Sequence, residues 1–348
     1  MAKTAVVLFN LGGPDGPEAV EPFLFNLFFD PAIIRLPTPL RWLLAKVISR
    51  RRAPLAREIY REMGGGSPLL PNTEAQAAAL TAALQRRGLD DARVFIAMRY
   101  WHPRAAETAR QVAAFGPQRV VLLPLYPQYS TTTSASSLKE WHEAARAAGI
   151  AAETRTLCCY PQETGFVDAV VERLREALRG LGHDRPPRVL FSAHGLPKKI
   201  VEQGDPYQWQ VEQSVAAVLH RLGEVNLDWR ICYQSRVGPL EWIGPATDSE
   251  ITKAGEEGCP IVVVPIAFVS EHSETLVELD IEYRHLAEKA GAPAYVRIAT
   301  AGSDAPFIDG LAGLVAQALA SERPVCSHAG GRICPAAWRG CAQPAAAS

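Results

Sequence analysis

Short apolar runs rich in β-branched residues recur along the chain and alternate with segments of helical periodicity. The apolar runs predict strands at residues 5–11, 93–98, 119–125, 152–157, 188–193, 229–234, 261–268 and 294–298. Segments between them, such as 72–87, 166–180 and 208–222, repeat apolar positions with the period of a helix. Strands that are apolar throughout and alternate with helices indicate parallel sheets covered on both faces. We therefore expect a doubly wound α/β architecture.

Two stretches of the first half match stretches of the second half in their pattern of residue types. RVVLLPLYPQYSTTTSAS resembles PIVVVPIAFVSEHSETL, because each passes from an apolar strand through Pro to a Ser/Thr-rich helix start. VVLFNLGGP and RVLFSAHGLP align in the same way. These matches predict two similar Rossmann-like domains, each with a four-stranded parallel sheet, and a cleft between them. We place the domains at residues 1–150 and 151–322, followed by a Cys-containing extension at 323–348.

Carboxylates are concentrated directly after the strand expected at 261–268. The glutamates are spaced three, four and four positions apart: Glu271, Glu274, Glu278 and Glu282. On an α-helix this spacing places them within about 80° of one another, with His272 to the side. One interpretation is a solvated helix face whose first acids suit the helix dipole. The like charges repel at this spacing, however, and they begin where doubly wound folds bind ligands, so the stripe predicts a path for a divalent cation or for protons.

A histidine follows the strand expected at 188–193. Gly195 comes next and permits a sharp turn at the carboxyl end of the strand, where ligands of such folds bind. A structural role is one interpretation of His194. Imidazole is also a base near neutral pH and a ligand for Fe²⁺ or Zn²⁺, so His194 opposite Glu274 would form a sparse site of nitrogen and oxygen ligands. Such a site would hold a metal weakly enough to release it.

Length and composition narrow the classes of protein to which this chain can belong. Its 348 residues, 48% of them apolar, are enough for two domains with separate cores. The formal net charge of −1 creates no field that would attract nucleic acid, and no apolar run is as long as a membrane-spanning helix. The N-terminal stretch predicts a first strand instead of a signal peptide. We expect a cytoplasmic protein that does not bind nucleic acid.

Seven motifs, taken together, resemble those of the ferrochelatase family. In chain order they are LFNLGGPD, IYREMGGGSPLLPNT, LPLYPQYSTTTSAS, FSAHGLP, GDPYQWQV, CYQSRVGPLEWIGPATD and PIAFVSEHSETLVELDIEY. They run from residue 8 to about residue 284, which is most of the chain, and the ordered set is specific. The resemblance implies a lyase that inserts Fe²⁺ into protoporphyrin IX in the last step of haem synthesis. It also implies two Rossmann-like domains with a porphyrin cleft between them.

The resemblance also implies roles for individual residues. His194 is similar to the active-site histidine of the family and Glu274 to its partner, so both are expected to meet the incoming Fe²⁺. Glu278 and Glu282 continue the acidic row of the family. The residues expected to contact the porphyrin are Leu11, Arg99, Tyr100, Tyr126, Ser130 and Trp242. Two alternatives stay open: His194 binds metal, accepts pyrrole protons or does both, and the acidic row lets metal in or protons out.

An apolar stretch with a basic end occupies residues 22–52. It is rich in Phe, Leu and Ile and ends with Lys46, Arg50, Arg51 and Arg52. An ordinary helix packed in the core is one interpretation. Ferrochelatases use the matching segment as a lip over the porphyrin, and an apolar surface beside basic residues also suits an anionic bilayer. We expect a peripheral contact with the inner face of the membrane, without insertion.

Three of the seven cysteines lie in the last 23 residues. Cys326, Cys334 and Cys341 are spaced more widely than the CxxC pairs of zinc ribbons and ferredoxins. Many ferrochelatases hold a [2Fe–2S] cluster with three C-terminal cysteines and a distant fourth, and the chain resembles a bacterial ferrochelatase of this type. Cys158 is the first choice for the fourth ligand and Cys159 the second. A zinc site and free thiols are the alternatives.

Three further functions compete with this prediction. A chelatase that acts on coproporphyrin III would differ in the number of substrate propionates, which the sequence does not state. A non-enzymatic tetrapyrrole or haem carrier on the same fold would have no need of an acidic row. A zinc hydrolase built from His194, His272 and Glu271 would lack a compact HExxH-type ligand set. The sequence therefore favours iron insertion into protoporphyrin.

Overall fold

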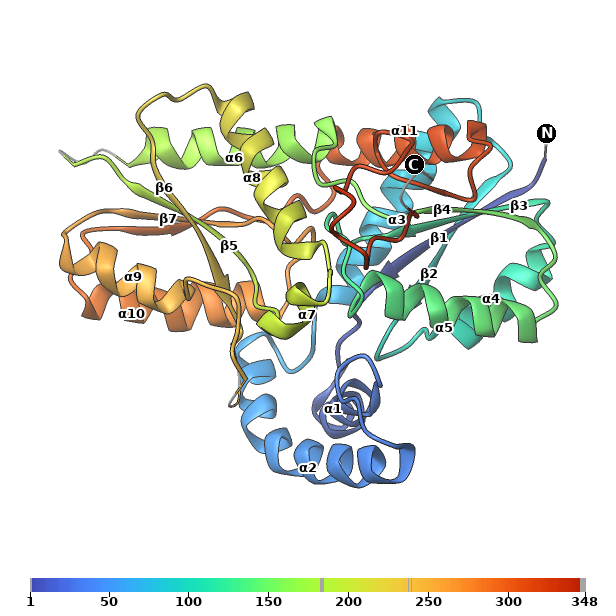
Figure 1. Cartoon of the computed structure of the whole chain (residues 1–348), viewed down its shortest axis with the longest axis horizontal. Coiled ribbons are helices and arrows are strands. Elements are labelled where there is room, and N and C mark those ends of the chain that lie inside the picture. Colours follow the sequence, from blue (N-terminus) through green and yellow to red (C-terminus); the bar gives the residue numbers. More distant parts are fainter. Residues whose placement is uncertain (1, 182–184, 237, 239, 345–348) are drawn as a thin grey trace. The chain divides into compact units, whose positions relative to one another are not determined.

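The computed structural model of the chain describes residues 2–181, 185–236, 238 and 240–344. Its strands and helices alternate as the apolar pattern predicts, and they divide between two units (Figure 1). Unit 1 comprises residues 1–159 and 312–331, and unit 2 comprises residues 160–311 and 332–348. The boundary passes through the helix α11 (Ala305–Ala320), which therefore contributes residues to both units.

Unit 1 is built on a five-stranded parallel sheet in the order β2-β1-β3-β4-β9. The strands are β1 (Thr4–Asn10), β2 (Ala92–Met98), β3 (Arg119–Pro124), β4 (Glu153–Leu157) and β9 (Val325–Cys326). Thr4 of β1 is in register with Ala92 of β2 and with Arg119 of β3, so β1 lies between them. All seven residues of β1 are buried, as expected for a strand with both faces covered.

Helices lie along both sides of this sheet. On one side, α4 (Ala105–Phe115) and α5 (Ser134–Ala147) share a core with Ala5, Val7 and Phe9 of β1. Figure 1 shows α4 and α5 along that side and α11 along the other. The helix α3 (Leu69–Arg86) packs against β2. The apolar strands of unit 1 are therefore covered by amphipathic helices, as the alternating pattern predicts.

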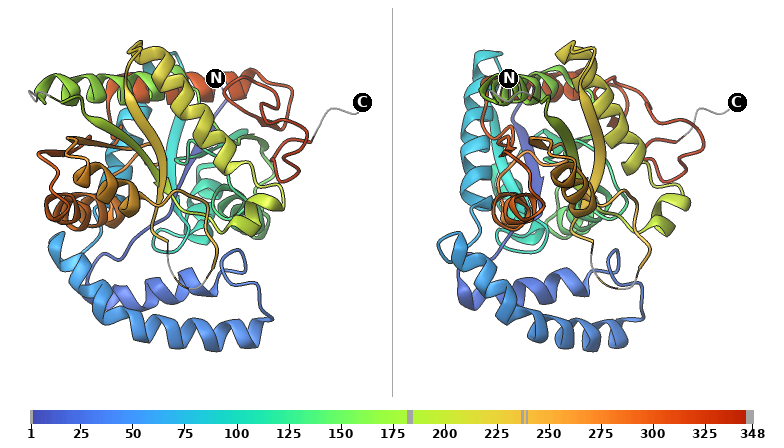
Figure 2. Two further views of the ribbon diagram at one scale, coloured as in Figure 1. Left: turned by 60° about the vertical axis from the view of Figure 1, so that its left-hand side comes forward. Right: turned by 90° about the vertical axis from the view of Figure 1, so that its left-hand side faces the viewer.

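The lip, residues 22–52, is formed by two helices of unit 1. A short 3₁₀ turn (Pro17–Ala19) leads into α1 (Val20–Phe29), and a loop leads on to α2 (Thr38–Glu62). The two helices pack side by side (Figure 2). Glu21 of α1 lies 3.2 Å from Nζ of Lys46 and 3.6 Å from Nε of Arg50, both on α2. These ion pairs and the apolar contacts of the two helices join the lip into one element.

Unit 2 is built on a four-stranded parallel sheet in the order β6-β5-β7-β8. The strands are β5 (Arg188–His194), β6 (Asp228–Gln234), β7 (Ile261–Pro265) and β8 (Tyr295–Arg297). Arg188 of β5 is in register with Asp228 of β6 and with Ile261 of β7. The first strand of each unit along the chain thus lies inside its sheet, and the strand order reverses beside it.

Helices cover the sheet of unit 2 in the same manner. α9 (Thr247–Glu256) and α10 (Tyr283–Lys289) share a core with β5, β7 and β8, including Leu190, Ile251 and Val263. α6 (Thr164–Gly180) and α8 (Tyr207–Leu222) pack together on the other side (Figure 1). Two further elements are the short helix α7 (Lys198–Glu202) and a π-helix, η2 (Glu274–Glu282). Both follow strands of this sheet at its carboxyl edge.

The eight strands expected from the sequence are present, and a ninth was missed. β9 has two residues, which is too short for any periodicity to reveal, and it makes the first sheet five-stranded instead of four-stranded. β4, expected in the second domain, pairs with β3 in unit 1. The extension expected at 323–348 divides between the two units. No helix within the part of the chain that the structure describes is both long and apolar enough to cross a membrane.

Candidate active site

The strand order of unit 2 brings two loops together at the carboxyl edge of its sheet. β5 lies between β6 and β7, so the chain leaves β5 in one direction and returns on its other side. His194 is the last residue of β5, and η2 begins at Glu274, nine residues after β7 ends. Ligands of doubly wound folds bind at such a reversal of strand order. The topology therefore places both predicted residues where a ligand is expected.

Two imidazoles face one carboxylate at this edge. Nε2 of His194 lies 3.7 Å from Oε2 of Glu274, and Nε2 of His272 lies 3.9 Å from the same oxygen. Nδ1 of His194 donates to the carbonyl of Gly195 (2.6 Å), and Nδ1 of His272 donates to that of Ser270 (3.1 Å). Because a carbonyl can only accept, each Nδ1 carries a proton, and a neutral ring presents a bare Nε2 to Glu274.

We call His194, His272 and Glu274 the acceptor cluster, because three lone-pair atoms converge there when both rings are neutral. Burial alone would raise the pKa of Glu274, but the positive charge that His194 and His272 carry when protonated, together with a hydrogen bond from His272, outweighs it and lowers that pKa to about 2. Glu274 is therefore ionised near neutral pH. A cation at the cluster, either a proton on an imidazole or a metal ion, stabilises this carboxylate.

The spacing of the acceptor cluster leaves room for one ion. A bound metal lies about 2 Å from a nitrogen or oxygen ligand, so atoms 3.7 and 3.9 Å apart can share one between them. Among the described residues, no group of three or more His, Cys, Asp or Glu side chains is already arranged around such a point. His194 is the most exposed of the three side chains, at 43%, and His272 the least, at 10%. The cluster is thus open toward His194 and suits a transient ion better than a structural one.

The position of His272 corrects the prediction that it lies to the side of the acidic stripe. That prediction assumed an α-helix from residue 270 onward, whereas the π-helix begins at Glu274. His272 lies in the turn before it, where its backbone N–H donates to Oγ1 of Thr275 and its ring packs on Phe268. A helix start placed at Glu274 would have revealed His272 as a second loop residue at the sheet edge.

The acidic row continues along η2 from the acceptor cluster to the surface. The carboxylate of Glu278 accepts hydrogen bonds from the backbone N–H of Ser235 (2.8 Å), from Nε2 of Gln234 (3.1 Å) and from the hydroxyl of Tyr283 (3.0 Å). Ser235, whose N–H is one of these donors, adopts a left-handed φ of 58°. Glu282 is exposed, and partial desolvation together with the charge of Glu278 raises its pKa. The row thus runs from a half-buried carboxylate to an exposed one.

Arg297 on β8 holds the other two acids of this region. Its Nη1 donates to Oε1 of Glu271 (2.7 Å), which also accepts the backbone N–H of Thr300 (2.8 Å). Its Nε and Nη2 pair with the carboxylate of Asp280. Glu271 was expected in the stripe, but this ion pair gives it a structural role, because residue 271 precedes the helix. Asp280 is likewise held by Arg297 and points away from the row.

Replacing Arg297 with methionine is expected to lower the free energy of unfolding by about 3–5 kcal/mol, because it leaves two carboxylates without their partner. The side chain of Arg297 is 8% exposed, so solvent cannot replace the lost contacts. Chemical denaturation measures the change. Arg221→Met is the matched control, since Arg221 is 57% exposed in its pair with Asp168 and should change stability little. Equal effects of the two substitutions would contradict a clamping role for Arg297.

Three residues expected to contact the porphyrin follow strands of unit 1. β1 lies between β2 and β3, so Leu11 after β1 and Tyr126 after β3 lie at the reversal of strand order in this sheet. Both side chains are half-buried. Ser130 is 2% exposed, and its hydroxyl lies 2.9 Å from that of Thr132 within the same loop. The structure therefore brings Leu11 and Tyr126 to the carboxyl edge and directs Ser130 into the loop.

Arg99 and Tyr100, expected to contact the porphyrin, point inward after β2. Tyr100 is 2% exposed, and its hydroxyl donates to Oδ2 of Asp30 (2.7 Å). Arg99 donates to the same oxygen (2.9 Å) and to Glu140 (2.9 Å), and its side chain is 13% exposed. A direct contact between Tyr100 and a ligand is not supported by this burial. The two side chains act as supporting residues beneath the edge of the sheet.

Trp242 of unit 2 lies beside the turn that follows His194. A Cβ atom at Gly195 would approach the Trp242 ring to 3.2 Å and the carbonyl oxygen of Gln234 to 2.9 Å. Only glycine fits there without displacing one of these groups. Nε1 of Trp242 is buried and has no hydrogen-bond partner among the described residues. Trp242 thus packs against the loop that carries His194.

The cysteines expected to hold a cluster lie in two groups. Cys326 lies beside Cys158 in unit 1, and Cys334 lies beside Cys341 in unit 2. In unit 1, the N–H of Cys158 donates to the carbonyl of Cys326 (2.8 Å), and the Sγ atoms of Cys158 and Cys159 are 3.2 Å apart. In unit 2, a hydrogen bond with Cys334 lowers the pKa of Cys341 to about 6 despite its partial burial. This hydrogen bond favours the thiolate of Cys341, the form that binds metals. The choice between Cys158 and Cys159 stays open.

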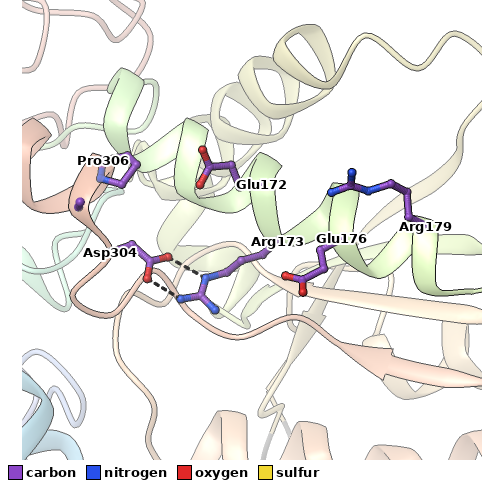
Figure 3. A pocket seen from close by; sticks show the side chains of 7 residues that line it. Glu172, Arg173, Glu176, Arg179, Asp304 and Pro306 are labelled. Carbon is purple, nitrogen blue, oxygen red and sulfur yellow. Dashed lines mark hydrogen bonds and ion pairs between the residues drawn. The ribbon is translucent and has the colours of Figure 1, made fainter.

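A surface hollow of about 520 Å³ in unit 2 lies away from these residues. Its lining comes from α6 and the start of α11: Glu172, Arg173, Glu176, Arg179, Asp304, Ala305 and Pro306. Figure 3 shows Arg173 and Asp304 joined by two hydrogen bonds, of 2.9 and 2.7 Å. The hollow contains none of the residues predicted to act on substrate.

Two imidazoles and a carboxylate at the switch point of a parallel sheet define a metal-handling α/β protein of the chelatase class. The ferrochelatase family model matches residues 3–319. The ferrochelatase of Phenylobacterium zucineum (strain HLK1) is 57% identical over 341 residues, with 98% of each chain covered. That of Caulobacter vibrioides (strain NA1000 / CB15N) is 55% identical, with 97% of each chain covered. The chain belongs to the ferrochelatase family, lyases that insert iron into protoporphyrin in haem biosynthesis.

A solved structure supports the fold independently of the close relatives. SirB from Bacillus subtilis with Fe³⁺ superposes with a TM-score of 0.50 at 14% sequence identity, covering 91% of this chain and 96% of that chain. At this identity the likeness concerns the fold alone. It agrees with the two parallel sheets of five and four strands.

Proposed function

We propose that the chain inserts Fe²⁺ into protoporphyrin IX by exchanging the ion for pyrrole protons at the acceptor cluster. The observation that carries this proposal is the convergence of two bare Nε2 atoms on Oε2 of Glu274. A carboxylate flanked by two imidazoles is a set of ligands that Fe²⁺ accepts. The same three groups are bases that protonate when no metal is present.

The net charge of the acceptor cluster favours using the same residues to bind Fe²⁺ and to accept the pyrrole protons. Insertion replaces the two N–H protons of the porphyrin by one Fe²⁺, so each turnover releases two protons. With Glu274 ionised and both imidazoles neutral, the cluster carries one negative charge. Its charge becomes +1 with Fe²⁺ bound and is again +1 after accepting two protons. The surrounding dipoles therefore stabilise the same net charge before and after the exchange, with little reorganisation.

Protons leave the cluster along the acidic row in this proposal. His194 is the most exposed member, so it takes the first pyrrole proton, and Glu274 shares the second with His272. Glu278 and Glu282 follow on η2, and the raised pKa of Glu282 suits a group that binds and releases protons near the surface. Entry of Fe²⁺ along the same row is the alternative.

Porphyrin contacts are proposed for residues of each unit. Leu11, Tyr126 and Ser130 belong to unit 1, and Trp242 belongs to unit 2. The roles of Arg99 and Tyr100 are proposed to be indirect, through the loops that they support. Binding energy from the non-reacting parts of the macrocycle is available to strain it, so that its nitrogen lone pairs face the metal.

Anaerobic mixing of the purified chain with Fe²⁺ and a porphyrin tests the proposal through the loss of porphyrin fluorescence. Faster loss than in the protein-free control, with protoporphyrin IX preferred to coproporphyrin III, is the expected result. A preference for coproporphyrin III would reassign the substrate within the class. Porphyrin binding without catalysed loss of fluorescence would indicate that the chain is a tetrapyrrole carrier and not an enzyme.

We also propose a [2Fe–2S] cluster held by Cys158, Cys326, Cys334 and Cys341, with Cys159 as the alternative to Cys158. Two observations support the donor set: Cys158 and Cys326 are neighbours in unit 1, and Cys334 and Cys341 are neighbours in unit 2. Four thiolates are the usual ligands of this cluster, which would supply one-electron chemistry or a structural link.

Cys334→Ser is expected to remove the cluster, because a serine hydroxyl replaces one of its four thiolate ligands. Iron and acid-labile sulfide analysis of the anaerobically purified protein should fall from about two atoms of each per chain to near zero. Cys259→Ser serves as the control, since Cys259 is buried in the core of unit 2 and belongs to neither group. Unchanged iron and sulfide in Cys334→Ser would remove this residue from the ligand set.

The lip is proposed to make a peripheral contact with an anionic bilayer at the cytoplasmic face of the membrane. Several of its apolar side chains are exposed: Ile33, Leu36, Leu40, Trp42, Leu43, Leu44 and Val47. Basic side chains of α2 that are also exposed include Arg50, Arg51 and Arg52. Apolar surface beside cations is the combination that binds peripherally to anionic lipid.

Trp42→Ser combined with Leu43→Ser is expected to weaken the binding of anionic vesicles by about tenfold or more, because two exposed apolar side chains lose their transfer energy. Cosedimentation with phosphatidylserine-containing vesicles measures it. Val225→Ser, at a 94% exposed position of unit 2, is the control for loss of an exposed apolar side chain. Equal binding by the wild-type chain and the double variant would exclude the lip as the contact.

A further inference from the structure

Asp30, at the end of α1, joins the lip to the body of unit 1 through a carboxylate that is 2% exposed. Oδ1 accepts the backbone N–H of Ala32 (2.9 Å) and so starts the loop between α1 and α2. Oδ2 accepts three hydrogen bonds, from Nη2 of Arg99 (2.9 Å), the hydroxyl of Tyr100 (2.7 Å) and the hydroxyl of Ser136 (2.7 Å). Four donors therefore fix one buried side chain in one orientation.

The donors come from separate parts of unit 1. Arg99 and Tyr100 follow β2, and Ser136 lies in the first turn of α5, after the loop that follows β3. One turn before Asp30, the side-chain amide of Asn26 donates to the carbonyl of Tyr100 (3.0 Å). The lip thus meets the carboxyl edge of the sheet through Asp30 and Asn26, at the edge where Leu11 and Tyr126 also lie.

The main chain at Asp30 makes the same connection. Its carbonyl accepts the N–H groups of Ile33 (3.0 Å) and Ile34 (2.9 Å), which fold residues 30–34 into a tight turn. Ile33 is 43% exposed and belongs to the apolar surface of the lip. A rotation at Asp30 would therefore redirect the exposed apolar side chains that follow it.

We infer that Asp30 is a positioning residue that sets the orientation in which the lip meets the porphyrin, an inference that rests on the proposed function. Asp30 touches neither the metal nor the pyrrole nitrogens in this account. The contacts that strain the macrocycle are assigned to other residues, Leu11, Tyr126, Ser130 and Trp242, so the lip contributes binding energy that is the same in the ground state and the transition state. Displacing the lip therefore raises the porphyrin KM and leaves kcat nearly constant.

Asp30→Asn tests this inference because an amide cannot satisfy the same four donors. If its oxygen replaces Oδ2, its NH₂ group faces the N–H of Ala32, and the turn that starts the loop is lost. If its NH₂ group replaces Oδ2, it faces three donors, and the positive charge of Arg99 keeps only Glu140 as its acidic partner. Either orientation loosens the base of the lip without changing the size of the side chain.

Two measurements are made on the full-length variant. Steady-state insertion kinetics with saturating Fe²⁺ should show the porphyrin KM raised about tenfold, the factor for losing a hydrogen bond to a charged group, with kcat within about twofold of wild type. Limited proteolysis with trypsin should show faster cleavage after Arg35, in the loop, or after Arg41, in the first turn of α2. Asp168→Asn is the control, because Asp168 pairs with the exposed Arg221 on unit 2.

Each outcome decides the inference. An unchanged KM with unchanged cleavage, or a loss of kcat at constant KM, would overturn it. If Asp30→Asn does not fold, Ser136→Ala removes one of the three donors to Oδ2 and is judged by the same two criteria. A wild-type chain without insertion activity would defeat the proposed function, and the tryptic pattern would still show whether Asp30 holds the lip.

Discussion

His194→Ala is expected to lower kcat for iron insertion by about 10²–10⁴-fold, the usual contribution of a positioned acid–base group. The variant loses the most exposed Nε2 of the acceptor cluster, which both meets Fe²⁺ and takes the first pyrrole proton. Porphyrin binding should persist, because the proposed ring contacts are other residues. Stopped-flow or steady-state fluorescence gives kcat, and fluorescence titration without metal gives the porphyrin Kd.

His285→Ala provides the matched control for loss of an imidazole. His285 is exposed on α10 and makes no contact with the acceptor cluster among the described residues. Its kcat should equal that of the wild-type chain. Near-normal turnover by His194→Ala would contradict both roles assigned to this residue, whereas loss of porphyrin binding would indicate a contact with the ring instead.

Glu274→Gln is expected to lower kcat by about 10²-fold or more while the protein stays folded. The amide has the shape of the carboxylate but no negative charge, so the cluster loses its attraction for Fe²⁺ and one of its proton acceptors. Its NH₂ group can donate to the bare Nε2 of His194 or His272, which replaces part of the lost charge interaction. The melting temperature should therefore stay close to that of wild type.

Glu288→Gln, on the exposed side of α10, is the control for this change and should leave kcat and stability unaltered. A normal kcat for Glu274→Gln would support the other interpretation of the acidic row, in which it is a solvated helix face without a role in insertion. A large drop in melting temperature would instead show that Glu274 is held for stability, and the functional account of the cluster would fail.

The sequence predicted most of the fold because its strands are apolar on both faces. Such runs, separated by helical periodicity, permit few arrangements other than parallel sheets between helices, and all eight expected strands are present. β9 was not predicted because two residues are too few to show a periodicity. The domain boundary was placed too early because the sequence of β4 does not show which sheet this short strand joins. Pairing partners are a tertiary property that a local pattern does not contain.

Part of the candidate site was predicted, because the sequence shows which polar residues directly follow apolar strands. His194 and Glu274 stood out because each follows an apolar strand, and the strand order brings such positions together. His272 and Arg297 did not stand out, since their roles depend on where the π-helix starts and on an ion pair across 26 residues. The burial of Tyr100 depends on Asp30, which is 70 positions away. Contacts between distant residues decide which polar side chains face a ligand.

X-ray absorption at the iron edge of the porphyrin-free protein tests the central claim most directly, because it counts the imidazole ligands of bound Fe²⁺. The measurement is made on the Cys334→Ser chain, so that no cluster iron contributes to the spectrum. We predict two imidazoles and carboxylate oxygen in this chain, and one imidazole fewer when His194→Ala or His272→Ala is added. The prediction requires that the three acceptor atoms bind one ion together. Spectra that are identical with and without these two substitutions would place the iron elsewhere and contradict the account.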